Sequence, residues 1–462
     1  MTIHIKSLVR SRGGAAIAIA LALAACNVND LLDVPDPDVA TPLSVQDKSA
    51  LPAVLAGAQA DLMVAYNGNQ STNLVTGTAL LTDEMIHAET FPTRIEFDQR
   101  NIAAATNTDL QTVFRNLHIA RVAAERTTDG FAKFDPTNAG FAEALNLEGM
   151  TYVYFGEIWC NGVAFSHVDA AGNQTYGGAI SNDSMFILAI ARFDSATKVL
   201  GTNASAAATL QLNFARVGKA RAMLNRAQTA ADAAAAAAVA AAVPTSFSYD
   251  IAHSDNTARQ NNGTFVLVYD SRRFSIANNE GGNGLPFVTD GASDPRVANA
   301  RGTGVASTGF DGSTPLFQEL KMPLRTSPIT VANGIEARLI EAEANLRGGG
   351  AAWVTTLNTL RTNNVTPPLP PNISASGNAT TDQNTFFKER AYWLFLTAHR
   401  LGDMRRLIRQ YGRAANTVFP TGAYFKGGIY GSDVNFPIYF DEKNNPKFNG
   451  APANGFCTDR NP

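Results

Sequence analysis

"FAEALNLEGMTYVYFGEIW", residues 141–159, alternates small and aromatic side chains. This run predicts one continuous helix over about 139–159, with Asn138 or Thr137 as its N-cap. Upstream, apolar residues spaced three and four apart predict a helix over 108–127. The two helices are joined by a Gly- and Pro-containing turn, so we expect them to form an antiparallel pair.

The same arrangement recurs along the chain and predicts a mainly α, helical-repeat scaffold of the tetratricopeptide kind, although no clean 34-residue signature is present. We expect repeats over about 108–243 and 332–411. The further helical predictions are 44–66, 73–90, 181–200 paired with 207–243, 332–347 paired with 351–362, and one long helix over 382–411.

Residues 245–330 differ in composition from the predicted helical segments, because they are dense in Gly, Asn, Asp, Ser and Pro. The stretch "FVLVYD", residues 265–270, is typical of a strand, and we expect short β-strands in this region. Long loop-rich segments within compact proteins are more often functional than idle. Residues 245–330 are therefore the predicted ligand region, and a polar loop at 161–180 is its expected neighbour.

Aromatic rings with polar groups nearby suit sugars, whose rings have apolar C–H faces and a fringe of hydroxyls. We predict a ligand site between the two loops, while each aromatic could instead be a packing residue. The candidates in the ligand region are Tyr269, Arg272, Arg273, Phe274, Asn278 and Asn279, and those in the polar loop are Phe165, His167 and Tyr176.

The predicted helix 382–411 carries Glu389, Arg400 and Asp403 at spacings that place them on one face, together with large apolar residues. Because a lone buried charge is costly, we expect these three residues to form a structural ion-pair network. A ligand-binding role for Arg400 is the alternative.

The first 25 residues have a basic start, a short apolar middle and a small-residue end, as a secretory signal peptide does. The apolar run is too short for a transmembrane helix. Leu23-Ala24-Ala25-Cys26 resembles a bacterial lipobox, so we expect Cys26 to be acylated after cleavage and residues 26–45 to be a lipidated tether. An ordinary signal with an incidental cysteine is the alternative.

Removal of residues 1–25 from the 462-residue chain leaves 437 residues, which we expect to fold as a single body over 46–462. It also removes three basic residues, so the formal charge moves from −3 to −6. This balance argues against a nucleic-acid partner. Cys160 and Cys457 are predicted to form a disulfide or to remain as two buried thiols.

Enzyme motifs are absent from the sequence. His87 and Glu89 lack the spacing of a zinc-binding helix, and no nucleophile elbow, phosphate-binding loop or dinucleotide fingerprint is present. We expect no catalysis, no cofactor and no metal.

Several segments, in their order, resemble the SusD/RagB family of outer-membrane lipoproteins over essentially the whole mature chain. The segments are the lipobox, "LLDVPDPD" at 31–38, the aromatic helix 143–166, "SDPRV" at 293–297, "IEARLIEAEANLRGG" at 335–349 and "KERAYWLFLTAHRLGDMRR" at 388–406.

The resemblance implies four tetratricopeptide-like repeats and capture of an oligosaccharide or peptide nutrient at the cell exterior. It implies a SusC-like TonB-dependent outer membrane transporter as partner and a lipid anchor in the outer membrane. A structural helical-repeat adaptor without a small ligand is the alternative from another class, and an esterase or glycosidase is disfavoured by the absent motifs.

Overall fold

The computed structural model describes residues 47–68, 72–169 and 173–462, which belong to one compact unit. The predicted signal peptide, the Cys26 lipidation site and the tether 26–45 lie outside the described residues. The prediction of a mainly α, tetratricopeptide-like fold is confirmed. The longer helices are α3 (Leu51–Asn67), α4 (Leu74–Leu81), α5 (Pro92–Asp98), α6 (Thr108–Phe134), α7 (Ala139–Ile158), α8 (Asn182–Leu200), α9 (Ala206–Arg226), α10 (Ala230–Ala240), α13 (Gly334–Arg347), α14 (Ala352–Asn363), α15 (Ala379–Trp393) and α16 (Arg400–Tyr411).

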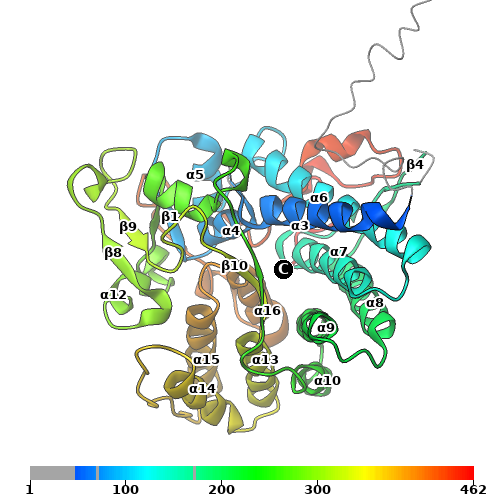
Figure 1. Ribbon diagram of the computed structural model, residues 1–462. Helices are drawn as coiled ribbons and strands as arrows, with labels where there is room; N and C mark the ends of the chain where they lie inside the picture. The colour runs from blue at the N-terminus through cyan, green and yellow to red at the C-terminus, as the bar shows by residue number, and fades with distance from the viewer. Residues whose placement is uncertain (1–46, 69–71, 170–172) are drawn as a thin grey trace, which may run out of the picture. The chain divides into compact units, whose positions relative to one another are not determined.

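Neighbouring helices pack as successive antiparallel partners (Figure 1). Helix α7 packs against α6, α8 and α9, and α10 packs against both α9 and α13, so the two helical segments of the chain form one continuous scaffold.

The strands are short and pair two by two in antiparallel fashion. The pairs are β1 (Met85–His87) with β7 (Phe274–Ile276), β2 (Val163–Ala164) with β5 (Ala179–Ile180), β3 (His167–Val168) with β4 (Gln174–Thr175), β6 (Ser248–Ile251) with β10 (Ile329–Asn333), and β8 (Asn299–Arg301) with β9 (Phe317–Glu319). The shortest helical turns are η2 (Lys48–Ala50), η3 (Ala258–Gln260), α11 (Gly263–Phe265), η4 (Val266–Asp270), η5 (Glu280–Gly282), α12 (Phe287–Asp290), η6 (Pro295–Val297), η7 (Gly304–Ser307), η8 (Ala415–Thr417), η9 (Phe440–Asn444) and η10 (Pro452–Asn454).

The small residues of α7 admit the aromatic rings of α8. A Cβ placed on Gly156 would lie 2.7 Å from the Phe186 ring, and one on Gly149 would lie 2.9 Å from the Phe193 ring. Real Cβ atoms do not approach so closely, because dispersion attraction turns to repulsion. The alternation of small and aromatic residues in α7 therefore sets the close packing of α7 on α8.

Two predicted helices are each divided in the structure. The segment 207–243 breaks after Arg226, where Thr229 and Asp232 form a capping box that starts α10. The segment 73–90 ends as a helix at Leu81 and continues as strand β1.

The predicted strand at 265–270 is wrong, because these residues continue a helical turn. The side chain of Asn262 accepts a hydrogen bond from the Phe265 backbone N–H at 3.0 Å and starts α11, which runs on as the π-helical turn η4. An N-cap of this kind favours helical geometry over the intrinsic β preference of Val and Tyr.

The predicted single helix over 382–411 is also wrong. Helix α15 ends at Trp393, and Leu396 and Ala398 adopt positive φ angles of 53° and 58° before α16 begins. Tertiary hydrogen bonds replace the helical ones at this break. Glu84 Oε1 accepts from the Leu396 N–H at 2.9 Å, and the Thr397 carbonyl accepts from Tyr66 Oη at 2.8 Å.

The break separates Glu389 on α15 from Arg400 and Asp403 on α16, which one helical face was expected to hold together. Glu389 pairs with Arg296 and Arg361, each at 2.6 Å, whereas Arg400 Nε pairs with Asp83 at 2.7 Å. The prediction of one shared face is wrong, although all three side chains are buried in ion pairs.

Asp403 belongs to a buried ion-pair cluster that joins five helices. Arg406 Nη2 lies 2.8 Å from both Asp403 of its own helix and Glu343 of α13, and Arg390 Nε of α15 lies 3.0 Å from Asp403. The cluster extends to α7 and α9, where Arg221 Nε donates to Glu157 at 2.9 Å and Asn225 bonds both Glu157 and Arg406. Burial alone would raise the pKa of Asp403, but the two arginines lower it to about 2.

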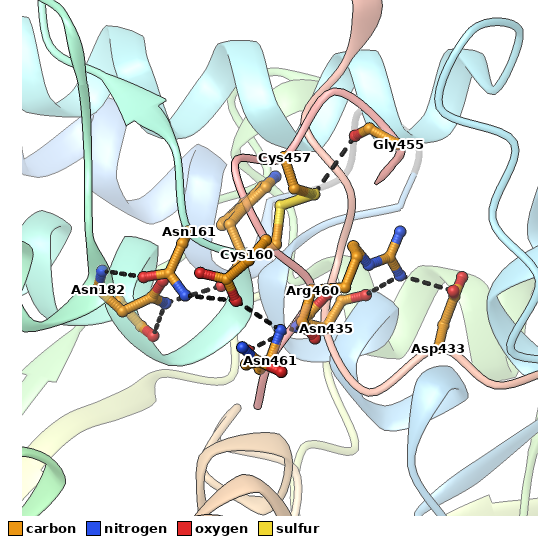
Figure 2. The surroundings of a disulfide bond; sticks show 12 residues. Cys160, Asn161, Asn182, Asp433, Asn435, Gly455, Cys457, Arg460 and Asn461 are labelled. Atoms are coloured by element: carbon orange, nitrogen blue, oxygen red, sulfur yellow. Dashed lines mark hydrogen bonds and ion pairs between the residues drawn. A yellow bond between two sulfur atoms is a disulfide. The ribbon is translucent and has the colours of Figure 1, made fainter. Parts of the chain in front are cut away.

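A disulfide joins Cys160, just after α7, to Cys457 near the end of the chain (Figure 2). Their Cα atoms are 5.9 Å apart, and 297 residues separate them in sequence. Around it, Asn182 Nδ2 donates to the Trp159 carbonyl at 2.8 Å, and Asn435 Nδ2 donates to the Arg460 carbonyl at 3.0 Å. The disulfide thus closes the C-terminal tail onto the end of α7.

Replacing Arg406 should strongly destabilise the fold, because Glu343 would remain as a buried charge without its guanidinium. We expect Arg406→Met to lower the free energy of unfolding by ~3–5 kcal/mol. In the matched control, Lys219→Met breaks the exposed pair with Asp194 and should cost ~0–1 kcal/mol. Urea unfolding with an unchanged m-value measures both. Equal urea midpoints for the two variants would contradict the assignment of the cluster as the centre of the scaffold.

The double variant Cys160→Ala/Cys457→Ala should lose ~2–5 kcal/mol of stability, because the disulfide closes a long loop in the unfolded chain. Thermal unfolding with and without dithiothreitol tests this. The natural chain should become less stable in reductant, and the double variant should not respond. If reductant leaves the stability of the natural chain unchanged, the disulfide contributes nothing to that stability.

Candidate ligand-binding surface

Three exposed phenylalanines from distant parts of the chain gather on one surface, here called the aromatic platform. Phe91, Phe310 and Phe425 are 48%, 53% and 47% exposed. Such exposure is unusual for large aromatic side chains, which carry much of the burial energy of a protein. Exposed apolar groups that gather on one surface mark binding sites.

Cations lying against the rings bring the three segments of the aromatic platform together. The guanidinium of Arg273 lies 5.1 Å from the ring centroid of Phe91 and 5.2 Å from that of Phe310. Lys426 Nζ lies 5.7 Å from the Phe425 ring and donates to Asp311 at 2.6 Å and to the Glu89 carbonyl at 2.7 Å. These are cation–π distances.

Short backbone interactions place each ring. Phe91 is the N-cap of α5, where Pro92 follows at the first helical position. Phe310 lies in a turn whose backbone N–H donates to the Arg272 carbonyl at 2.7 Å, next to the β1–β7 pair. Phe425 lies at the tip of a hairpin in which the Tyr424 N–H donates to the Gly428 carbonyl at 3.1 Å.

A layer of buried acids lies under the aromatic platform. Arg94 Nη1 donates to the buried Glu89 carboxylate at 2.6 Å, and Arg273 donates to its other oxygen. Arg94 Nε also lies 3.2 Å from Asp109. Each cation near the rings therefore has a carboxylate partner.

The surface is close to electrical neutrality. Arg94, Arg273 and Lys426 face the carboxylates Glu89, Asp109 and Asp311. Burial opposes ionisation of Asp311, but hydrogen bonds from Lys426 and Thr314 lower its pKa overall.

His87, beside these groups, adds no charge. Burial, aided by the charges of Lys426 and Arg94, lowers the pKa of His87 to about 3. The arrangement presents exposed aromatic rings beside paired polar groups, with no excess of either charge.

The residues predicted from the sequence lie only partly at the aromatic platform. Phe274 is fully buried in β7, while its neighbour Arg273 reaches the aromatic platform. Tyr269 is half-buried, stacks on Phe265 at 4.8 Å and donates to the Glu319 carbonyl. Arg272 donates to the Val305 carbonyl, and exposed Asn278 accepts from the Thr289 N–H at 3.1 Å.

The second predicted loop lies away from this surface. Phe165 packs against Tyr152 and Phe155 at 5.1 Å each, and His167 Nδ1 lies 2.8 Å from Glu125. Tyr176, next to β4, is exposed. Strand β4 and the β8–β9 pair occupy opposite sides of Figure 1, so the two loops do not enclose one site.

Phe91, Phe310 and Phe425 were missed because each lies alone in a turn sequence. Their surroundings, "TFPTR", "TGFDGS" and "YFKGG", combine one phenylalanine with Gly, Pro or a charged residue. That context is the available signal, since a phenylalanine in a turn is poorly placed to enter a core. Their proximity depends on tertiary structure.

No group of metal-ligating side chains with the geometry of a metal site occurs in the described part of the chain. Within residues 47–68, 72–169 and 173–462, no helix combines the length and apolar character needed to cross a bilayer.

Solved structures share this fold at low sequence identity. A SusD/RagB family protein from Bacteroides thetaiotaomicron is 13% identical with a TM-score of 0.62, covering 84% of this chain and 94% of its own. A laminarin-binding SusD-like protein is 14% identical with a TM-score of 0.63, covering 87% and 98%.

A SusD-like carbohydrate-binding protein from Bacteroides vulgatus is 15% identical with a TM-score of 0.56, covering 79% and 83%. No protein-family model matches the sequence, and no curated protein is similar to it. The chain has the fold of the SusD-like proteins.

Proposed function

We propose that this protein is a non-catalytic, lipid-anchored surface protein of the SusD/RagB family that captures oligosaccharides and passes them to a SusC-like TonB-dependent outer membrane transporter. The aromatic platform is the observation that carries the proposal. Phe91, Phe310 and Phe425 offer exposed apolar surface to sugar rings, while Arg273 and Lys426 lie against these rings and could donate to hydroxyl groups.

The balanced charge of the aromatic platform favours a neutral oligosaccharide. An acidic glycan would need cations free to meet its carboxylates or sulfates, because desolvating an anion is costly unless it is paired. Here Arg273 already pairs with Glu89 and Lys426 with Asp311. Two structures that share the fold are described as carbohydrate-binding and laminarin-binding, which supports a glycan over a peptide.

The lipid anchor and the transfer to the transporter belong to the same proposal. A lipid on Cys26 would hold the binder beside its transporter and raise the effective concentration of captured ligand there. The disulfide between Cys160 and Cys457 is in keeping with export to an oxidising compartment.

Removing one ring of the aromatic platform should weaken glycan binding at least about tenfold, which is ~1.4 kcal/mol. The variants are Phe91→Ala, Phe310→Ala and Phe425→Ala, measured by calorimetry against a panel of neutral glycans that includes laminarin. Tyr176→Ala is the matched control, because it removes an exposed aromatic from the other predicted loop. Loss of binding in the Tyr176 variant alone would contradict the proposed site.

Replacing the predicted lipidation site should release the protein from the membrane. We expect the natural chain to incorporate palmitate and to sediment with outer membranes in high salt, and Cys26→Ser to do neither, since a polypeptide without acyl chains has no hydrophobic anchor. Fractionation of labelled cells measures this. Membrane attachment that survives the substitution would contradict the lipid anchor.

A further inference from the structure

The hairpin that carries Phe425 is tied to the body of the protein by two buried tyrosines. This platform hairpin, residues 422–430, is closed by hydrogen bonds from the Tyr424 N–H to the Gly428 carbonyl and from the Tyr430 N–H to the Gly422 carbonyl, at 3.1 and 3.0 Å. Phe425 and Ile429 face solvent at its tip, whereas the rings of Tyr424 and Tyr430 are buried and meet edge to face at 5.2 Å.

The hydroxyl groups of both tyrosines donate hydrogen bonds to carboxyl groups. Tyr424 Oη donates to Asp98 Oδ2 at 2.7 Å, and Tyr430 Oη donates to Glu280 Oε1 at 3.0 Å. Asp98 Oδ2 also accepts from the His87 N–H at 2.8 Å. The hairpin therefore rests on an acid pair that comes from α5 and η5, two elements far apart in sequence.

The acid pair lacks a donor between its members. Asp98 Oδ1 and Glu280 Oε2 are buried, and neither accepts a hydrogen bond from a donor of the described chain. The contacting rings of Tyr424 and Tyr430 bring the two carboxyls near each other, and a proton on Glu280 would supply the missing donor to Asp98. Carboxyl groups in such contact do not both ionise readily, because like charges repel strongly away from water.

Among the described residues no cation pairs directly with Asp98 or Glu280, although Lys426 acts on Asp98 and Arg100 on Glu280 through space. The guanidinium of Arg100 is directed to the carbonyls of Asp433 and Pro420, and Lys426 is held by Asp311. Asp83, which adds negative charge near Glu280, is engaged by Arg400.

His87, a further titratable neighbour, brings no positive charge to the acid pair. His87 is neutral and contributes only its backbone N–H. Burial, reinforced by the neighbouring Asp98, raises the pKa of Glu280 well above its usual range.

We propose that Asp98 and Glu280 hold one shared proton that positions the platform hairpin, so that loss of this proton loosens Phe425 and weakens ligand binding. The inference rests on the proposed function for its ligand and names the residues that control the site. Asp98 and Glu280 are positioning residues, because they act through Tyr424 and Tyr430 and not on the ligand.

The physical step is local opening. With both carboxyls ionised, two negative charges would share a buried contact, and the least costly relief is entry of water at the hairpin base. A short hairpin at the surface opens at far lower cost than the helical body. Opening withdraws Phe425 from Phe91 and Phe310 without unfolding the scaffold.

Glu280→Gln tests the inference, because a glutamine amide donates to Asp98 at every pH as the protonated acid does. Glycan affinity is measured by calorimetry from about pH 6 to about pH 10, a range that spans documented values for buried glutamates. The natural chain should lose at least about tenfold in affinity toward the alkaline end. Glu280→Gln should bind within about threefold of the natural chain at pH 6 and should not show the alkaline loss. Asp98→Asn, whose amide can donate to Glu280, is the second variant should the first fail to fold.

Glu341→Gln is the matched control, because Glu341 pairs with Arg338 on the distant helix α13, and this variant should keep the alkaline loss. Hydrogen exchange of residues 422–431 without ligand is the independent readout, and it should accelerate beyond the intrinsic pH effect in the natural chain only. A natural chain with no such change in exchange, or a Glu280→Gln variant that loses affinity as the natural chain does, would overturn the inference. If the hairpin opens as the pH rises but no glycan binds at any pH, the result would support control of the hairpin by the proton and reject the proposed function.

Discussion

The scaffold depends on the buried ion-pair cluster centred on Arg406. This guanidinium meets Asp403 and Glu343, while Arg390 shares Asp403 and Asn225 links Arg406 to Glu157. A buried charge left unpaired costs several kcal/mol, so five helices must keep their places for every member to be satisfied. Hydrophobic contacts tolerate small shifts, but bidentate pairing of guanidinium and carboxylate does not.

A short series of contacts connects α16 to the aromatic platform. Arg400, at the start of α16, holds Asp83, and Glu84 accepts from the backbone between α15 and α16. Strand β1 follows directly and pairs with β7, which places Glu89 beneath Arg273. The aromatic platform is thus built on polar contacts that begin in the helical core.

A second line of contacts starts from α16 toward the C-terminal tail. Arg405 donates to the carbonyls of Gly156 and Trp159 at 3.0 and 3.1 Å, which satisfies groups left open at the end of α7. The disulfide at Cys160 follows at once and fixes the tail that contains Cys457. One helix therefore supports both the aromatic platform and the closure of the chain.

Local patterns predicted the helices well where packing follows sequence, as in α7 with its small and aromatic residues. They failed where distant side chains form hydrogen bonds with the backbone. The backbone between α15 and α16 is bonded by Glu84 and Tyr66, which lie some 300 positions away in the sequence. The aromatic platform shows the same limit. Arg273 and Phe274 are adjacent in sequence, yet one reaches the rings and the other fills the core, and only the pairing of β7 with β1 decides which.

The two buried acid sites differ because of what surrounds them. Asp403 lies between Arg390 and Arg406, which keep it ionised against the effect of burial and lower its pKa to about 2. Its stabilisation is therefore complete above the unfolded value of about 4 and is lost only as the pH falls from there through about 2. No cation of the described residues pairs directly with Asp98 or Glu280, so burial raises the pKa of Glu280 and, on our proposal, the folded hairpin retains a proton. Stabilisation from that site is present in acid and declines as the pH rises toward the folded pKa. Ionised acids thus fix the scaffold, whereas a protonated acid holds the hairpin that carries Phe425.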